Sequence, residues 1–114
     1  LGKTMLERLG YHVTLCTDSR VALSLIQENP GTFDMLVTDQ TMPGMTGFDL
    51  ARHALQIRPN LPIILCTGYS NLVDEETAKQ AGISGFIMKP LTKKGLAELL
   101  AKVKHENNVQ AKMT

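Results

Sequence analysis

Aromatic residues are scarce in this sequence: they make up 4% of its 114 residues, and tryptophan is absent. No apolar run approaches the roughly 20 residues of a membrane-spanning helix, and the first residues do not have the pattern of a signal peptide. Lys and Arg number 12 against 11 Asp and Glu, which leaves a net charge of +1 and no basic cluster. We therefore expect no stacking platform for bases or sugars, no membrane contact and no direct binding of nucleic acid.

Cysteine is also rare, and its two copies, Cys16 and Cys66, stand too far apart for a metal-ligand motif. This usage favours a cytoplasmic protein with reduced thiols. The length is that of one domain, and a hydrophobic fraction of 43% with a charged fraction of 20% is typical of a globular chain. The composition argues against a disordered protein, a collagen and a coiled coil, and it allows a core without disulfides or structural metal.

Short apolar runs alternate along the chain with amphipathic stretches. Helices are expected where apolar residues recur at helical spacing, and strands where strand-forming residues stand between turn residues. The predicted helices are 1–9, 17–29, 48–58, 71–80 and 92–104, and the predicted strands are 11–16, 33–38, 63–66 and 84–88. This alternation implies an α/β fold with a parallel sheet and helices on both of its faces. We expect residues 1–104 to form the domain and the polar residues 105–114 to form a frayed tail.

Three residues with polar side chains, Asp39, Thr67 and Lys89, each follow a predicted strand. Each has a simpler interpretation alone, as a turn residue, a hydroxyl bonded to backbone and a solvated charge. The carboxyl ends of parallel strands, however, meet at one edge of the sheet, where sites commonly form. A carboxylate, a hydroxyl and an ammonium group together suit phosphoryl chemistry at the carboxylate. Asp39 would be the nucleophile, while Lys89 and Thr67 would contact phosphoryl oxygens.

Three motifs resemble the receiver domain of two-component response regulators. They are VTDQTMPGMTG at 37–47, ILCTGYS at 64–70 and GFIMKP at 85–90. The order of these motifs is very specific, and the resemblance covers residues 1–104. It implies a flavodoxin-like (CheY-like), doubly wound α/β fold that lacks its first strand here. The first two motifs are especially similar to receivers attached to hybrid sensor histidine kinases.

The resemblance implies a phosphorylation-controlled switch rather than a conventional enzyme. Asp39 matches the aspartate that takes a phosphoryl group from a phosphohistidine of a histidine kinase or phosphotransfer domain. Lys89 matches the lysine that contacts this group, and its bond to Pro90 is expected to be cis. Thr67 matches the switch hydroxyl and Phe86 the switch aromatic residue, without the hydroxyl of the more common tyrosine.

Two further positions, Thr41 and Tyr69, match those that tune the lifetime of the aspartyl phosphate in the family. The expected partner surface comprises the helix after Thr67, the last strand and the last helix. The family also binds Mg²⁺, for which Asp39 and the backbone carbonyl of Thr41 match two ligands. The acidic pair that completes the family's site, at the end of its first strand, has no match in this sequence, and Mg²⁺ usually takes one or two carboxylates.

The family's strand order is 2-1-3-4-5, so the unmatched strand would be the central one. Unpaired buried backbone groups cost about 1–3 kcal/mol each, which a domain could not absorb along a whole strand. We expect one of three arrangements. Strands 11–16 and 33–38 pair directly, a second chain fills the slot by strand swapping, or helix 1–9 and strand 11–16 detach and leave a three-stranded sheet. We favour the intermolecular arrangement, a homo-oligomer.

Two other functions remain alternatives. A haloacid-dehalogenase-like phosphatase also uses a strand-end Asp, a Thr and a Lys, but Asp39-Gln40-Thr41 lacks the second acid that such enzymes carry two residues on. A receiver-like interaction module that is never phosphorylated is the other. A phosphatase would turn over many equivalents of a small phosphodonor, a receiver would hold one, and an interaction module would take none.

Overall fold

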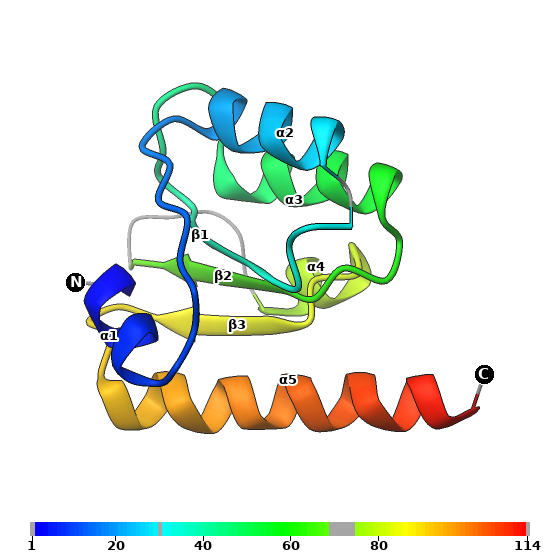
Figure 1. Ribbon diagram of the computed structural model, residues 1–114. Helices are drawn as coiled ribbons and strands as arrows, with labels where there is room; N and C mark the ends of the chain where they lie inside the picture. Colours follow the sequence, from blue (N-terminus) through cyan, green and yellow to red (C-terminus); the bar gives the residue numbers. More distant parts are fainter. Residues whose placement is uncertain (1, 30, 69–74, 114) are drawn as a thin grey trace.

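The computed structural model describes residues 2–29, 31–68 and 75–113, and it confirms the α/β class (Figure 1). The helices are α1 (Gly2–Arg8), α2 (Ser19–Glu28), α3 (Gly47–Ile57), α4 (Glu75–Gln80) and α5 (Lys93–Met113). The strands are β1 (Leu36–Asp39), β2 (Ile63–Thr67) and β3 (Gly85–Met88). Among the described residues, no helix has both the length and the apolar character needed to cross a membrane.

The three strands form a parallel sheet in the order β1-β2-β3. Asp39 at the end of β1 is paired with Cys66 of β2, and Thr67 at the end of β2 is paired with Met88 of β3. All three strands therefore end at the same edge of the sheet. This edge is where the polar residues predicted to form a site belong.

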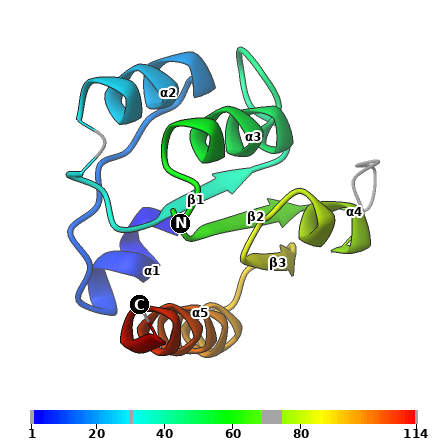
Figure 2. The same ribbon diagram turned by 90° about the vertical axis from the view of Figure 1, so that its right-hand side faces the viewer.

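Strand β2 lies in the middle of the core, and all five of its residues are buried. Ile63 and Leu65 face one apolar cluster, to which α2, α3 and α4 contribute Ile26, Ala51, Ala54 and Ala78. Ile64 and Cys66 face the other cluster, to which α5 contributes Leu96, Leu100 and Val103. Figure 2 shows α2 and α3 on one side of the sheet and α1 and α5 on the other. Helices thus cover both faces, as the alternation of the sequence predicted.

The end of α1 has the geometry expected for a glycine cap. Gly10 has a φ of 95°, which a residue with a side chain rarely adopts. Its N–H donates to the carbonyl of Glu7 at 3.0 Å, and the N–H of Tyr11 donates to the carbonyl of Leu6 at 3.1 Å. This pair of bonds is the Schellman motif, and it confirms the predicted end of the first helix.

The predicted strand 11–16 is wrong, because these residues are not in a strand. They run from the layer of α1 to the layer of α2, on the β1 side of the sheet (Figure 1, Figure 2). A strand persists only by hydrogen bonding to a neighbour, and within the described residues the sheet has no strand beyond β1 on that side. Strand-forming composition alone does not compensate for a missing neighbour.

The direct pairing of 11–16 with the following strand is therefore not formed, and the sheet has three strands in the part of the chain that the structure describes. Helix α1 is nevertheless not detached. Its side chains Met5 and Leu6, with Leu9 directly after the helix, pack against the cluster that joins β2 and α5. Apolar contacts thus hold the start of the chain on the domain without any strand pairing.

The last helix is longer than expected. It was predicted to end at residue 104, but α5 continues to Met113. Its residues include no proline, and its only glycine, Gly95, lies in the first turn. A polar composition by itself does not stop a helix, so a frayed tail from residue 105 is not what the backbone forms.

Candidate functional site

Backbone hydrogen bonds just beyond the strands hold the predicted site residues at one edge of the sheet. The N–H of Gln40 donates to the carbonyl of Cys66 at 2.8 Å, and the N–H of Lys89 donates to the carbonyl of Thr67 at 2.8 Å. The pairing of β2 with its two neighbours thereby extends past the ends of the strands. The residues that follow β1 and β3, Gln40 and Lys89, are therefore held by the same kind of backbone bond as the strands.

The structure brings Asp39 and Lys89 together across the end of β2. The Lys89 Nζ lies 3.2 Å from Oδ1 of Asp39. The two side chains are 43% and 42% exposed, so the pair is open to a molecule that approaches from solvent. A carboxylate nucleophile with an ammonium group beside it is the arrangement that the sequence predicted for phosphoryl chemistry.

Thr67 is placed at the same edge, but its hydroxyl has a different partner. The side chain is buried, and Oγ1 donates to the carbonyl of Gly68 at 3.1 Å. Phe86 lies in β3 opposite Leu65 and packs against the cluster that contains α3 and α4. The Lys89–Pro90 peptide bond is cis, as expected.

The loop from Asp39 to α3 is fixed by Gln40, a residue that the sequence analysis did not single out. Its Oε1 accepts the N–H of Phe48 at 2.8 Å, and its backbone carbonyl accepts the N–H of Gly47 at 3.0 Å. Gln40 is buried, whereas the next residue, Thr41, is exposed. The sequence offered no signal for this role, because the receiver motif leaves that position unspecified.

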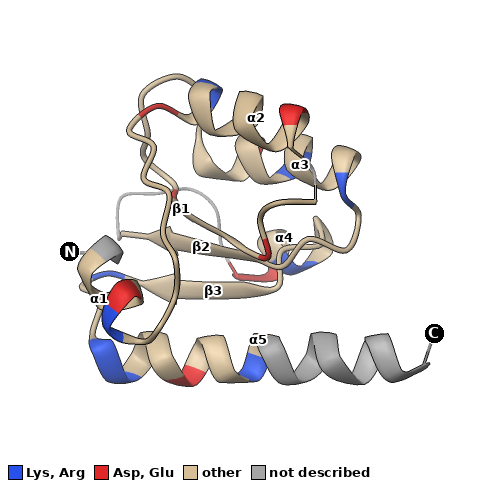
Figure 3. Cartoon of the chain, in the orientation of Figure 1, with Lys and Arg blue, Asp and Glu red and all other residues tan. Residues whose placement is uncertain are grey.

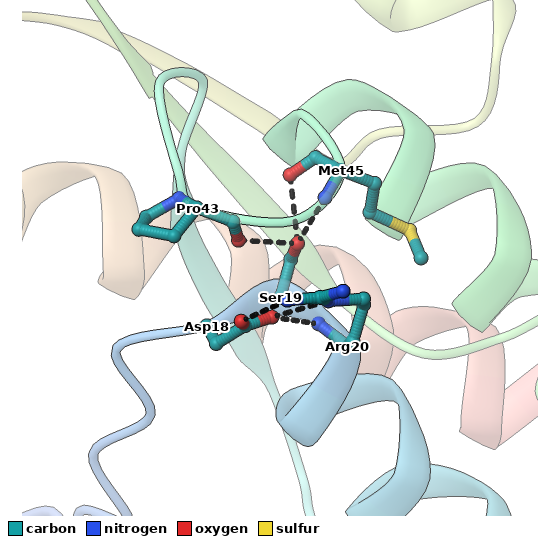
Figure 4. Close-up of polar contacts among 5 residues, drawn as sticks. All are labelled: Asp18, Ser19, Arg20, Pro43 and Met45. Carbon is teal, nitrogen blue, oxygen red and sulfur yellow. Dashed lines mark hydrogen bonds and ion pairs between the residues drawn. The ribbon is translucent and has the colours of Figure 1, made fainter.

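The far end of the same loop contacts the start of α2 through Ser19 (Figure 4). Ser19 lies inside the helix predicted for 17–29, where nothing in the sequence indicated a contact with another segment. Asp18 is the N-cap of α2, and hydrogen bonds from the side chain and the backbone N–H of Arg20 lower the pKa of Asp18. The serine next to it is thereby left free to bond the loop.

Asp39, at the end of β1, is the one charged residue of the three strands β1, β2 and β3. Figure 3 shows β2 and β3 without charged residues, while charges occupy the helices and loops. Burial raises the pKa of the Cys66 thiol to about 11, and the Asp39 carboxylate adds to this effect. The thiol beside the site is therefore neutral at physiological pH.

The described residues supply only part of a magnesium site. They contain no group of three or more His, Cys, Asp or Glu side chains that could hold a metal. Asp39 is a carboxylate ligand of the type that Mg²⁺ prefers, and Thr41 could add a backbone carbonyl. These two groups supply only part of the octahedral ligand set that Mg²⁺ requires. Tyr69, the other predicted tuning position, lies outside the described residues.

Comparison with known proteins decides the family. The model of the response regulator receiver domain matches residues 1–101. The chain belongs to the response regulator receiver family. Receiver domains are the phosphoacceptor modules of two-component signalling, and they generally bind Mg²⁺ and interact with histidine kinases or phosphotransfer proteins. The phosphatase alternative is therefore not favoured.

Curated receivers resemble the chain over most of its length. It is 38% identical over 104 residues to the chemotaxis protein CheY of Pseudomonas aeruginosa, covering 89% of this chain and 82% of that protein. It is 36% identical to CheY-3 of Vibrio cholerae, covering 89% of this chain and 78% of that one.

Solved structures agree with the receiver fold. The crystal structure of a response regulator receiver domain protein from Clostridium thermocellum superimposes with a TM-score of 0.87 at 27% identity, covering 95% of this chain and 86% of that one. A CheY-like receiver from Methanospirillum hungatei gives a TM-score of 0.78 at 30% identity, covering 98% and 86%. These likenesses confirm the flavodoxin-like fold.

Proposed function

We propose that Asp39 is the phosphoacceptor of this receiver domain. The observation that carries the proposal is the 3.2 Å contact between the Lys89 Nζ and Oδ1 of Asp39 at the carboxyl edge of the sheet. An oxygen of Asp39 forms the new P–O bond while the P–N bond of a donor phosphohistidine breaks. The imidazole nitrogen keeps the electron pair of the broken bond and then takes up a proton. Lys89 stabilises the charge on the phosphoryl oxygens.

Phosphorylation would then act on Thr67 and Phe86 as a two-state switch. The Thr67 hydroxyl, bonded here to Gly68 at 3.1 Å, turns toward the phosphoryl group, and Phe86 fills the space behind it. Phe86 lies on β3, which contacts α4 and α5, and Thr67 lies on β2, which is paired with β3. The responding partner surface is therefore formed by α4, β3 and α5, with Thr41 and Tyr69 tuning how long the phosphoryl group persists.

The same proposal includes a metal ion, the bounds of the domain and its partner protein. Mg²⁺ would neutralise phosphoryl charge, with Asp39 and the carbonyl of Thr41 as two of its ligands. The domain is taken as residues 1–104, with 105–114 as a C-terminal extension. The domain acts in the cytoplasm, and its partner is a histidine kinase or a phosphotransfer domain. The parent chain is a hybrid sensor histidine kinase. The domain contacts neither nucleic acid nor membrane directly.

The outer edge of β1 supports the expectation of an assembly. Within the described residues, β1 has a neighbour only on its β2 side. Such an edge is a template for a strand donated by a second chain. Light scattering at low concentration tests this arrangement. A dimer or larger assembly is expected, and a monomer that unfolds cooperatively would contradict it.

The acceptor role is tested by incubating the protein with acetyl phosphate and Mg²⁺ and measuring its intact mass. The wild type is expected to gain one phosphoryl group, and Asp39→Asn none. Asp49→Asn is the matched control, because it neutralises an exposed carboxylate on α3. An Asp39→Asn protein that is phosphorylated as fast as the control would overturn the proposal. A wild type that takes up no phosphoryl group would favour an interaction module that is never phosphorylated.

A further inference from the structure

The loop that follows Asp39 is held at two places. Gln40 ties its beginning to α3, while residues 43–45 lie against the first residue of α2. The second attachment joins segments that are more than 20 residues apart in the sequence, since Ser19 and Pro43 differ by 24 positions. It is independent of the strand pairing that positions Asp39 and Lys89.

A single buried hydroxyl makes most of this attachment (Figure 4). Ser19 has no exposed surface. Its Oγ accepts the N–H of Met45 at 2.7 Å and lies within donating distance of the carbonyl oxygens of Met45, at 2.7 Å, and Pro43, at 3.0 Å. The backbone N–H of Ser19 donates to the same Pro43 carbonyl at 3.1 Å.

Gly44 shows that the fit between the loop and the helix is tight. Its φ is 94°, and a Cβ at this position would lie 2.6 Å from Oδ1 of Asp18 and 2.8 Å from Oγ of Ser19. Any side chain on Gly44 would therefore push the loop away from α2. The glycine and the serine form the two halves of one contact.

We propose that Ser19 is a positioning residue for phosphoryl acceptance, acting through the loop between Asp39 and α3. The loop begins directly at the acceptor residue and carries Thr41, so its conformation sets how the carbonyl of Thr41 stands relative to the Asp39 carboxylate. Fixing residues 43–45 to α2 keeps the loop in one arrangement before a donor arrives. Preorganisation of this kind raises a reaction rate because the geometry is established in advance. This role rests on the proposed function of Asp39.

The test compares Ser19→Ala with Thr46→Ala, which changes the same loop. The Thr46 hydroxyl accepts a bond from the N–H of Asp49, at 3.2 Å, as the cap of α3. Both variants should be less stable than the wild type, but only Ser19→Ala frees the loop from α2. Thermal unfolding curves of the wild type and of each variant identify a temperature at which all the proteins are folded.

At that temperature the rate of phosphoryl uptake from acetyl phosphate is measured. Ser19→Ala is expected to react about 10-fold more slowly than the wild type, in the range that misplacement of reacting groups produces, while Thr46→Ala stays close to the wild type. Gly44→Ala adds a methyl group that pushes the loop away from α2. This variant should show the same slow rate as Ser19→Ala. In NMR spectra of the unphosphorylated proteins, Ser19→Ala should shift the amide resonances of Gln40 and Thr41, and Thr46→Ala should leave that of Thr41 in place.

An equal uptake rate in Ser19→Ala and Thr46→Ala would overturn the proposal, and so would unshifted resonances of Gln40 and Thr41. Either result would show that Ser19 only stabilises the fold, and Asp39 would remain the proposed acceptor. A wild type that takes up no phosphoryl group would instead overturn the proposed function of Asp39, and with it the role of Ser19.

Discussion

Gly47 lies against the backbone of Asp39 so closely that a Cβ on Gly47 would be 2.8 Å from the carbonyl carbon of Asp39 and nearer still to its oxygen. The helix α3, which follows the loop after Asp39, therefore starts in contact with Asp39 itself. Only hydrogen is small enough to occupy this space. The identity of Gly47 thus fixes the distance between α3 and the end of β1.

Replacing Gly47 by alanine tests that contact. The added methyl group must push α3 away from β1, and we expect the free energy of unfolding to fall by about 1–3 kcal/mol, the usual cost of overpacking. Urea denaturation measures the change. Gly31→Ala is the control, because Gly31 is exposed with open space around it, and it should stay within about 0.5 kcal/mol of the wild type. Equal losses in both variants would show that the contact is not a constraint.

Lys89→Met separates the electrostatic role of Lys89 from its packing. The variant keeps an apolar stem but loses the ammonium group that lies 3.2 Å from Asp39. Uptake of a phosphoryl group from acetyl phosphate should slow by about 100-fold, as for the loss of one charge-stabilising donor. Stability should change by less than about 1 kcal/mol, because the pair is half exposed. Lys79→Met on α4 serves as the control, and a variant of Lys89 that reacts like it would contradict the assigned role.

The buried thiol of Cys66 should make stability depend on alkaline pH. Its pKa is raised from an ordinary value of 9.0 to about 11, first by burial and then by Asp39. A folded state that holds its proton more tightly is stabilised fully below pH 9.0, and this stabilisation is lost as the pH rises to about 11. Because each pKa unit corresponds to about 1.4 kcal/mol, the loss is on the order of 2–3 kcal/mol.

The measurement is urea denaturation at several pH values across this window. Cys66→Ala should show a shallower fall in unfolding free energy than the wild type, whatever its stability at neutral pH. Cys16→Ala removes the other thiol and should keep the slope of the wild type. If the unfolding free energy of Cys66→Ala falls with pH as steeply as that of Cys16→Ala, the buried thiol is not the cause of the alkaline loss of stability.

Asp18 should make the free energy of unfolding depend on pH in the acidic range. Its pKa lies below the ordinary value of 3.8, because Arg20 bonds the carboxylate through its side chain and its backbone N–H. A group with a lowered pKa stabilises the folded state above its ordinary pKa, and this stabilisation disappears as the pH falls through the lowered value. The stability difference between the wild type and Asp18→Asn should therefore shrink on acidification. Asp34→Asn, at an exposed position before β1, is the control, and a difference that persists at low pH would contradict the assignment.

The site residues could be predicted from the sequence because each follows a short apolar run. Parallel strands bring their carboxyl ends together whatever their exact boundaries, so the placement of Asp39 and Lys89 did not depend on where β1 begins. That strand starts at Leu36 rather than at 33, and the site is unaffected. Periodicity within a segment was sufficient for this part of the fold.

Features that depend on distant neighbours could not be predicted in the same way. Residues 11–16 have strand-forming side chains, but a strand also needs a partner, which local composition does not reveal. The contacts of Ser19 and Gln40 arise only when the loop after Asp39 folds onto α2 and α3. A serine near a helix start looks the same in the sequence whether its hydroxyl caps the helix or bonds another segment.

Strand β2 has hydrogen-bonded neighbours on both sides and no exposed side chain. Its amide protons should therefore exchange with deuterium only when the whole sheet opens, while β1 and β3 can open from their outer edges. Strand β2, which carries Thr67, then keeps its backbone hydrogen bonds while signalling takes place. Rearrangements at the phosphorylation site would move side chains and flanking loops while β2 stays paired, so they would change the stability of the fold little.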